Sequence, residues 1–112
     1  MDGFVRTLYQ GEDEGEWTVD YIIYNLTGFD ADRVWITDGL LYGATVTEQH
    51  NVVDVRGMRV DLGAIPVGGK KHCSLRIRTQ SVDTGAYARL EGEVACSVLR
   101  SVTPQRSGSH VL

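Results

Sequence analysis

The segments 71–80 (KHCSLRIRTQ) and 87–101 (YARLEGEVACSVLRS) decide the fold class, because apolar residues recur in them at every second position. Successive side chains of a strand point to opposite faces, so this spacing is typical of strands with one buried face. The two segments predict an antiparallel hairpin in which Cys73 lies opposite Cys96 on the buried face. The hairpin would turn within 83–86, where Gly85 accepts a positive φ.

Charges on the other face favour the same register. It places Arg76 opposite Glu93 and Arg78 opposite Glu91, and opposite charges directly across a ladder stabilise a sheet. A shift of one residue would set Leu75 against a glutamate, which the alternation of buried and wet faces forbids.

The same alternation runs through most of the chain, and helix signals are nearly absent. Segments that carry Gly and Asp separate the strands. The expected strands lie near 4–9, 17–26, 33–38, 41–47, 52–63, 71–80 and 87–101. Seven short strands in a chain of 112 residues predict an all-β, seven-stranded antiparallel immunoglobulin-like sandwich. We expect one domain over 1–102 and a flexible C-terminal tail over 103–112.

The predicted core consists of apolar residues that alternate with polar ones along three of these strands. They are Trp17, Val19, Tyr21, Ile23, Val34, Ile36, Met58, Val60 and Leu62. The residues between them are polar: Thr18, Asp20, Arg33, Thr37, Arg59 and Asp61. Each of these strands therefore has one wet face, as is common in antiparallel sheets, so two sheets must close on each other.

Composition and charge exclude several classes of protein. Hydrophobic residues make up 42% of the chain and charged residues 23%, as in ordinary folded domains. No apolar run approaches the roughly 20 residues of a membrane span. The net charge is −4 and no basic cluster exceeds Lys70–Lys71, so we expect no nucleic-acid partner.

Three stretches then resemble one family. The stretch 21–40 (YIIYNLTGFDADRVWITDGL), the stretch 60–69 (VDLGAIPVGG) and Gly85–Ala88 resemble the strand, turn and final-strand blocks of the conserved-repeat domain of bacteria and archaea. The resemblance covers roughly 17–101. The luminal domain of the translocon-associated protein beta subunit and the bacterial cell-adhesion-related domain have a similar layout. All are similar to immunoglobulin-like modules.

The resemblance implies a non-catalytic structural or adhesive module of an exported or surface-attached protein, with protein partners or neighbouring domains. It would be extracellular or at the cell surface if this chain is part of a longer one. Two other functions stay open: a small calcium- or carbohydrate-binding domain, and a stand-alone protein that assembles by adding an edge strand to a partner. We expect no enzyme, because no nucleophile, histidine and acid fall together and no phosphate-loop pattern occurs. No cofactor is implied other than calcium.

Two cysteines and two sets of acidic residues are candidate sites. Cys73 and Cys96 form either a disulfide or two buried thiols, since their expected opposition allows both. Calcium could be held by the acidic residues of two loops, namely Glu12, Asp13, Glu14, Asp30 and Asp32. Their spacing matches no calcium-loop signature, so solvated acidic loops are the alternative.

Three aromatic residues are candidates for ligand binding. Trp35 alternates away from its apolar neighbours, so it is expected near Tyr24 and Tyr42 on a sheet face, where it could stack on a sugar or dock a partner. The alternative is a tryptophan covered by a loop or by the N-terminal strand. Asn25 opens a glycosylation sequon, yet we expect it to bond the backbone of its turn, and we expect Asp38 to close the next turn.

Overall fold

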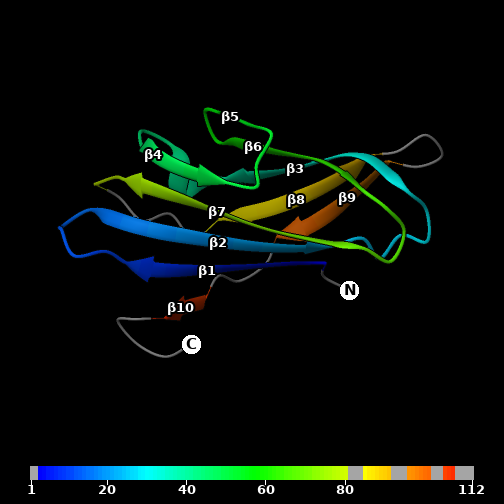
Figure 1. Ribbon diagram of the computed structural model, residues 1–112, viewed down its shortest axis with the longest axis horizontal. Coiled ribbons are helices and arrows are strands. Elements are labelled where there is room, and N and C mark those ends of the chain that lie inside the picture. Colours follow the sequence, from blue (N-terminus) through cyan, green and yellow to red (C-terminus); the bar gives the residue numbers. More distant parts are fainter. Residues whose placement is uncertain (1–2, 81–84, 92–95, 102–104, 108–112) are drawn as a thin grey trace.

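The computed structural model describes residues 3–80, 85–91, 96–101 and 105–107, with side chains described for 3–80 and 85–90. Ten strands over these residues form two sheets (Figure 1). The first sheet has the order β10 (Gln105–Ser107), β1 (Phe4–Gln10), β2 (Glu16–Tyr24), β7 (Lys70–Arg78), β4 (Thr45–His50). The second has the order β5 (Asp54–Arg56), β6 (Arg59–Ile65), β3 (Ala31–Asp38), β8 (Ala86–Glu91), β9 (Cys96–Ser101).

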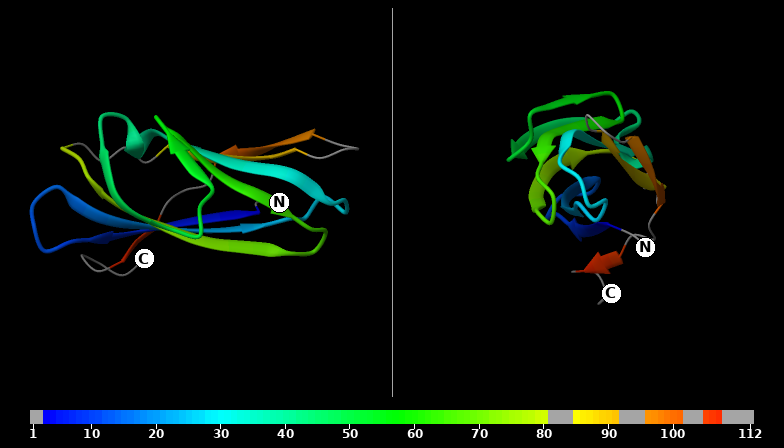
Figure 2. Two further views of the ribbon diagram at one scale, coloured as in Figure 1. Left: turned by 45° about the horizontal axis from the view of Figure 1, so that its top comes forward. Right: turned by 90° about the vertical axis from the view of Figure 1, so that its right-hand side faces the viewer.

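The two sheets pack face to face as a sandwich (Figure 2). All described strand pairs are antiparallel except β1 with β10, which run parallel. The all-β, two-sheet class predicted from the alternation is therefore confirmed, although the strands number ten over the described residues where seven were expected. Within the described part of the chain, no helix is long and apolar enough to cross a membrane.

The core lies between the two sheets and contains the residues that the alternation assigned to it, with one exception. Trp17, Val19, Tyr21 and Ile23 of β2 are buried, as are the predicted apolar residues of β3 and β6. The prediction that Met58 belongs to the core is wrong, because this residue is 39% exposed. The expected strand 52–63 is in fact the hairpin of β5 and β6, and Met58 lies in its two-residue turn beside Gly57, which has a φ of +56°.

The predicted hairpin of 71–80 with 87–101 is also wrong. β7 pairs with β2 and β4 in the first sheet, so Cys73 lies opposite Tyr21 instead of Cys96. β8 and β9 pair with each other in the second sheet. Alternation fixes which face of a strand is buried but leaves its neighbour open, and the chain crosses from one sheet to the other between β7 and β8.

The charge rule behind that hairpin is satisfied by other partners. Arg76 Nη1 lies 3.2 Å from Glu48 Oε2 of β4, and Arg78 Nη2 lies 4.0 Å from Glu16 Oε2 of β2. The expectation that Arg76 and Arg78 face opposite charges therefore holds, whereas the predicted register and partner strand are wrong. Glu93 lies outside the described residues.

The expected C-terminal tail, 103–112, is described only at 105–107. These three residues form β10 and extend the first sheet beyond β1 (Figure 1). Polar residues can form the backbone ladder of an edge strand. The flexibility expected for 103–112 stays a prediction.

A buried ion pair joins the two sheets. Arg6 of β1 and Asp38 of β3 are both fully buried, and Arg6 Nη1 donates a hydrogen bond to Asp38 Oδ1. Asp38 also accepts hydrogen bonds from Tyr21 OH (2.7 Å) and from the backbone N–H of Leu40 (2.9 Å). The second bond caps the 3-10 turn η1 (Gly39–Leu41), so the prediction that Asp38 closes a turn is confirmed.

Candidate functional sites on the two outer faces

The β1–β2 turn shapes a hollow on the outer face of the first sheet. The turn is closed by hydrogen bonds from Gly11 N to Glu16 O (2.7 Å) and from Glu16 N to Asp13 O (3.1 Å). Gly15 has a φ of +80° and accepts a hydrogen bond from Thr79 N (2.8 Å). A Cβ on Gly15 would lie 2.7 Å from the carbonyl oxygen of Thr79, so only glycine lets the turn dock against the end of β7.

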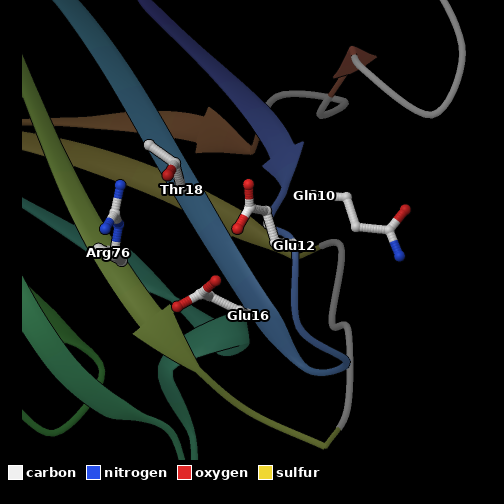
Figure 3. Close-up of a pocket in the computed structure, with 6 residues that line it drawn as sticks. Gln10, Glu12, Glu16, Thr18 and Arg76 are labelled. Atoms are coloured by element: carbon white, nitrogen blue, oxygen red, sulfur yellow. The ribbon is translucent and has the colours of Figure 1, made fainter.

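The hollow has a volume of about 500 Å³, within the range of small-molecule sites. Its lining comes from the end of β1, the turn, β2 and β7: Gln10, Gly11, Glu12, Glu16, Thr18 and Arg76. Figure 3 shows the carboxylates of Glu12 and Glu16 and the guanidinium of Arg76 around one space beside Thr18, with Gln10 pointing away from it.

The lining groups combine hydrogen-bond acceptors with donors. Two carboxylates accept, the Arg76 guanidinium donates, and the Thr18 hydroxyl does both. Arg76 is held toward β4 by Glu48, and Glu16 lies within ion-pair distance of Arg78. These partners fix the side chains before a ligand arrives, which lowers the entropy lost on binding.

An aromatic residue adjoins the hollow. Tyr9 lies directly across the ladder from Thr18 on the same outer face and is 39% exposed. Directly opposed residues in an antiparallel pair have Cβ atoms roughly 5 Å apart. A ring at this position can pack against the apolar face of a ligand that occupies the hollow.

The predicted aromatic group, Trp35, Tyr24 and Tyr42, is not brought together. Tyr24 ends β2 in the first sheet, at the end of the sandwich where the β2–β3 loop lies (Figure 1). Tyr42 follows η1 at the opposite end and is 76% exposed. Trp35 lies on β3, on the outer face of the second sheet, where three arginines surround its ring.

These arginines, and not the loop or N-terminal strand of the alternative prediction, lie over Trp35. The Cζ atom of Arg59 lies 4.2 Å from the ring centroid, and those of Arg89 and Arg33 lie 5.4 Å and 5.5 Å from it. All three distances are within the range of cation–π attraction. We call Arg33, Trp35, Arg59 and Arg89 the arginine face.

The predicted calcium ligands are divided between the two ends of the molecule. Glu12, Asp13 and Glu14 belong to the β1–β2 turn, whereas Asp30 and Asp32 belong to the β2–β3 loop and the start of β3 (Figure 1). Asp30 Oδ1 accepts a hydrogen bond from Val67 N at 2.8 Å. The described residues contain no group of three or more acidic, histidine or cysteine residues placed to hold a metal.

Cys73 and Asn25 are both enclosed by the fold. Cys73 is a buried free thiol on β7, and burial raises its pKa to about 12, so it stays protonated at neutral pH. The side chain of Cys96 lies outside the described residues. Asn25 is buried and its side-chain amide donates to the carbonyls of Phe29 and Ile65, which confirms its predicted role in the turn.

The fold defines this chain as a β-sandwich module with two polar outer faces. Its sequence matches no family model and no curated protein. The resemblance to the conserved-repeat domain and the immunoglobulin-like assignment therefore stay predictions.

Solved structures from Thermococcus kodakarensis KOD1 and Vibrio harveyi share the fold. The chain is similar to the chitin-binding domains ChBD2 and ChBD3 of Thermococcus kodakarensis KOD1, each at 19% identity over 81% of this chain. The match covers 90% of ChBD2 with a TM-score of 0.53 and 88% of ChBD3 with a TM-score of 0.52. It is also similar, at 9% identity, to part of a GH20 exo-β-N-acetylglucosaminidase from Vibrio harveyi in complex with N-acetylglucosamine. There the TM-score is 0.52 over 93% of this chain, and the match spans only 17% of the enzyme.

Proposed function

We propose that this chain is a non-catalytic carbohydrate-binding module that holds a neutral sugar in the hollow of the first sheet. The observation that carries the proposal is the lining of Glu12, Glu16, Thr18 and Arg76, with Tyr9 beside it. Sugars present rows of hydroxyl groups with apolar ring faces, and fixed acceptors and donors next to an exposed aromatic ring match that pattern.

The structural similarity to these proteins suggests which sugar to test first. Two neighbours in fold are chitin-binding domains, and the third was solved with N-acetylglucosamine. A β-linked chain of N-acetylglucosamine is therefore the first ligand that we propose for the hollow. Such polymers lie outside cells, which is consistent with a module of an exported or surface-attached protein, joined to neighbouring domains or protein partners.

The test is binding of the full chain to insoluble chitin and to soluble N-acetylglucosamine oligomers, measured by calorimetry. We expect binding without release of shorter sugars. Glu16→Ala and Arg76→Ala should each weaken binding about tenfold or more, the loss expected for one hydrogen bond to a charged group. Asp32→Ala and Lys70→Ala are matched controls, because each removes the same kind of charge at the far end of the molecule.

The proposal fails if the folded chain binds neither form of the sugar, or if the hollow variants bind as well as the controls. A chain that binds no sugar would instead fit the structural or adhesive module implied by the family resemblance. Release of shorter sugars would contradict the non-catalytic part of the proposal.

A further inference from the structure

The outer face of the second sheet concentrates positive charge that is dispersed in the sequence. Arg33, Arg59 and Arg89 come from β3, β6 and β8, three adjacent strands. In the register, Trp35 lies across from Arg89 on one side and from Asp61 on the other. The Cζ atoms of all three arginines lie within 5.5 Å of the centroid of the Trp35 ring, so residues from three strands meet around one side chain.

The tryptophan ring orders these guanidiniums. A planar guanidinium that stacks on an aromatic face loses rotational freedom before any ligand binds, yet it keeps N–H donors at its rim. Arg59 is further held by Asp61, whose Oδ1 accepts from Arg59 Nε at 3.0 Å, and its side chain is 38% exposed. The arginine face is thus a set of pre-positioned donors.

The charge balance of this face is opposite to that of the chain. The edge strand β5 adds Arg56, opposite Arg59 in the register, so four arginines lie on this face. The acidic positions are fewer: Asp54, Asp61 and, across from Arg33, Glu91. Asp54 pairs with Arg56 at 2.8 Å and Asp61 with Arg59 at 3.0 Å, which leaves Arg33 and Arg89 against Glu91. This small local surplus of positive charge, in a chain with a net charge of −4, fits an anionic partner.

We propose that the arginine face binds an anionic polysaccharide through carboxylate or sulfate groups spaced along the sugar chain. Guanidiniums pair with both groups through two parallel N–H bonds. A polymer fits better than a small anion because the arginines of this face come from four adjacent strands, β5, β6, β3 and β8, and one sugar chain can cross them all. The acidic positions among the arginines can accept hydrogen bonds from the hydroxyl groups of the same sugar chain.

The same geometry disfavours nucleic acid. Single-stranded nucleic acids stack bases on exposed aromatic rings, and Arg59 already lies over the ring of Trp35. The proposal uses none of the residues of the hollow, so it does not depend on the neutral-sugar site.

The experiment measures binding of the full chain to polygalacturonate, to dextran sulfate and to neutral dextran, each at low and high salt. We expect binding of at least one of the two anionic polymers, weakened by salt, and no binding of neutral dextran. The double variant Arg33→Gln/Arg59→Gln should bind about tenfold or more weakly. Lys70→Gln, which removes a positive charge from the first sheet, should bind as the unchanged chain does.

Two further variants keep the test decisive. Arg59→Lys retains the charge but loses the planar guanidinium, so it should also weaken binding, which a response to net charge alone would not produce. If the double variant does not fold, as judged by circular dichroism, Arg89→Gln takes its place. N-acetylglucosamine oligomers report separately on the hollow in every variant.

Three results would overturn the proposal. The first is a folded chain that binds neither anionic polymer, and the second is equal binding by the arginine variants and Lys70→Gln. The third is an oligothymidylate that binds more tightly than both polymers and is lost in the same variants, which would make nucleic acid the partner.

Discussion

The two outer faces of the sandwich are built from the same alternating strands and differ in almost everything else. The first sheet carries a hollow rich in carboxylates, because the β1–β2 turn docks beside β7. The second sheet carries arginines that come from three adjacent strands and surround one tryptophan ring. Inward positions are constrained by packing, whereas outward positions are free to diverge, so one sandwich can present two surfaces of different chemistry.

The largest expected effect comes from breaking the buried ion pair that joins the two sheets. Asp38→Ala leaves Arg6 buried without its carboxylate, and we expect it to lower the free energy of unfolding by about 3–5 kcal/mol. Urea denaturation measures this, and both faces should lose their ligands together as the chain unfolds. Asp61→Ala, which breaks a surface pair, is the control and should cost at most about 1 kcal/mol. Equal costs for the two variants would show that the buried pair does not join the sheets.

Alkaline pH should lower the stability of the sandwich that carries both faces, because two groups buried in the first sheet, Cys73 and Tyr21, lose protons. Burial raises the pKa of Cys73 from 9.0 to about 12, so the unfolded chain loses this proton before the folded chain does. Stability is therefore fully present below pH 9 and should fall by about 1.4 kcal/mol per pH unit between pH 9 and 12. Burial also raises the pKa of Tyr21 above 10.0, with the negative charge of Asp38 adding to the effect, so a second loss begins above pH 10.

Urea denaturation at several alkaline pH values measures these losses. Cys73→Ala should remove the part of the slope that begins near pH 9 and leave the part due to Tyr21. An unchanged slope in Cys73→Ala would contradict the assignment.

A smaller difference in stability is expected between variants of the two aromatic residues on the outer faces, Trp35 and Tyr9. Trp35→Ala removes the ring that lies within cation–π distance of three guanidiniums, and we expect it to lower the free energy of unfolding by about 1–2 kcal/mol. Tyr9→Ala removes a partly exposed ring with less packing, and should change stability by only about 0.5 kcal/mol. Thermal unfolding compares the two, and a larger loss for Tyr9→Ala would reverse the comparison.

Calcium should have no effect on either face. The acidic residues once grouped as its ligands lie at opposite ends of a molecule 44 Å long, so we expect the same melting temperature with calcium and with chelator. Magnesium serves as the control for general effects of divalent ions. A calcium-specific rise in melting temperature would show a site that the described residues do not form.

The sequence predicted the inward face of nearly every strand, because that face depends only on a local period of two. It missed Met58 because the two-residue turn at Gly57 interrupts an otherwise continuous pattern. It missed the burial of Arg6 because an arginine on an inward position reads as a surface residue until its partner, Asp38, is known. Both errors concern contacts between positions that the local pattern does not link.

The candidate sites were predictable only in part. Trp35 was singled out for an aromatic cluster with Tyr24 and Tyr42, which the fold does not assemble. Glu12 was singled out as a calcium ligand, and the structure instead places it in the lining of the hollow. Glu16 and Tyr9 were not singled out, and Arg76 was noted only as a cross-strand partner, since a lone charge or tyrosine on a wet face carries no signal of a binding site in the sequence.

The sequence by itself determined an all-β chain with one buried and one wet face per strand, since those properties follow from side-chain alternation within each strand. The tertiary structure alone decided which strands are neighbours. Strand pairing is a long-range choice set by the burial that the whole sandwich achieves, and the chain passes repeatedly between its two sheets. That choice separated Cys73 from the strand of Cys96 and gathered Arg33, Arg59 and Arg89 around one ring.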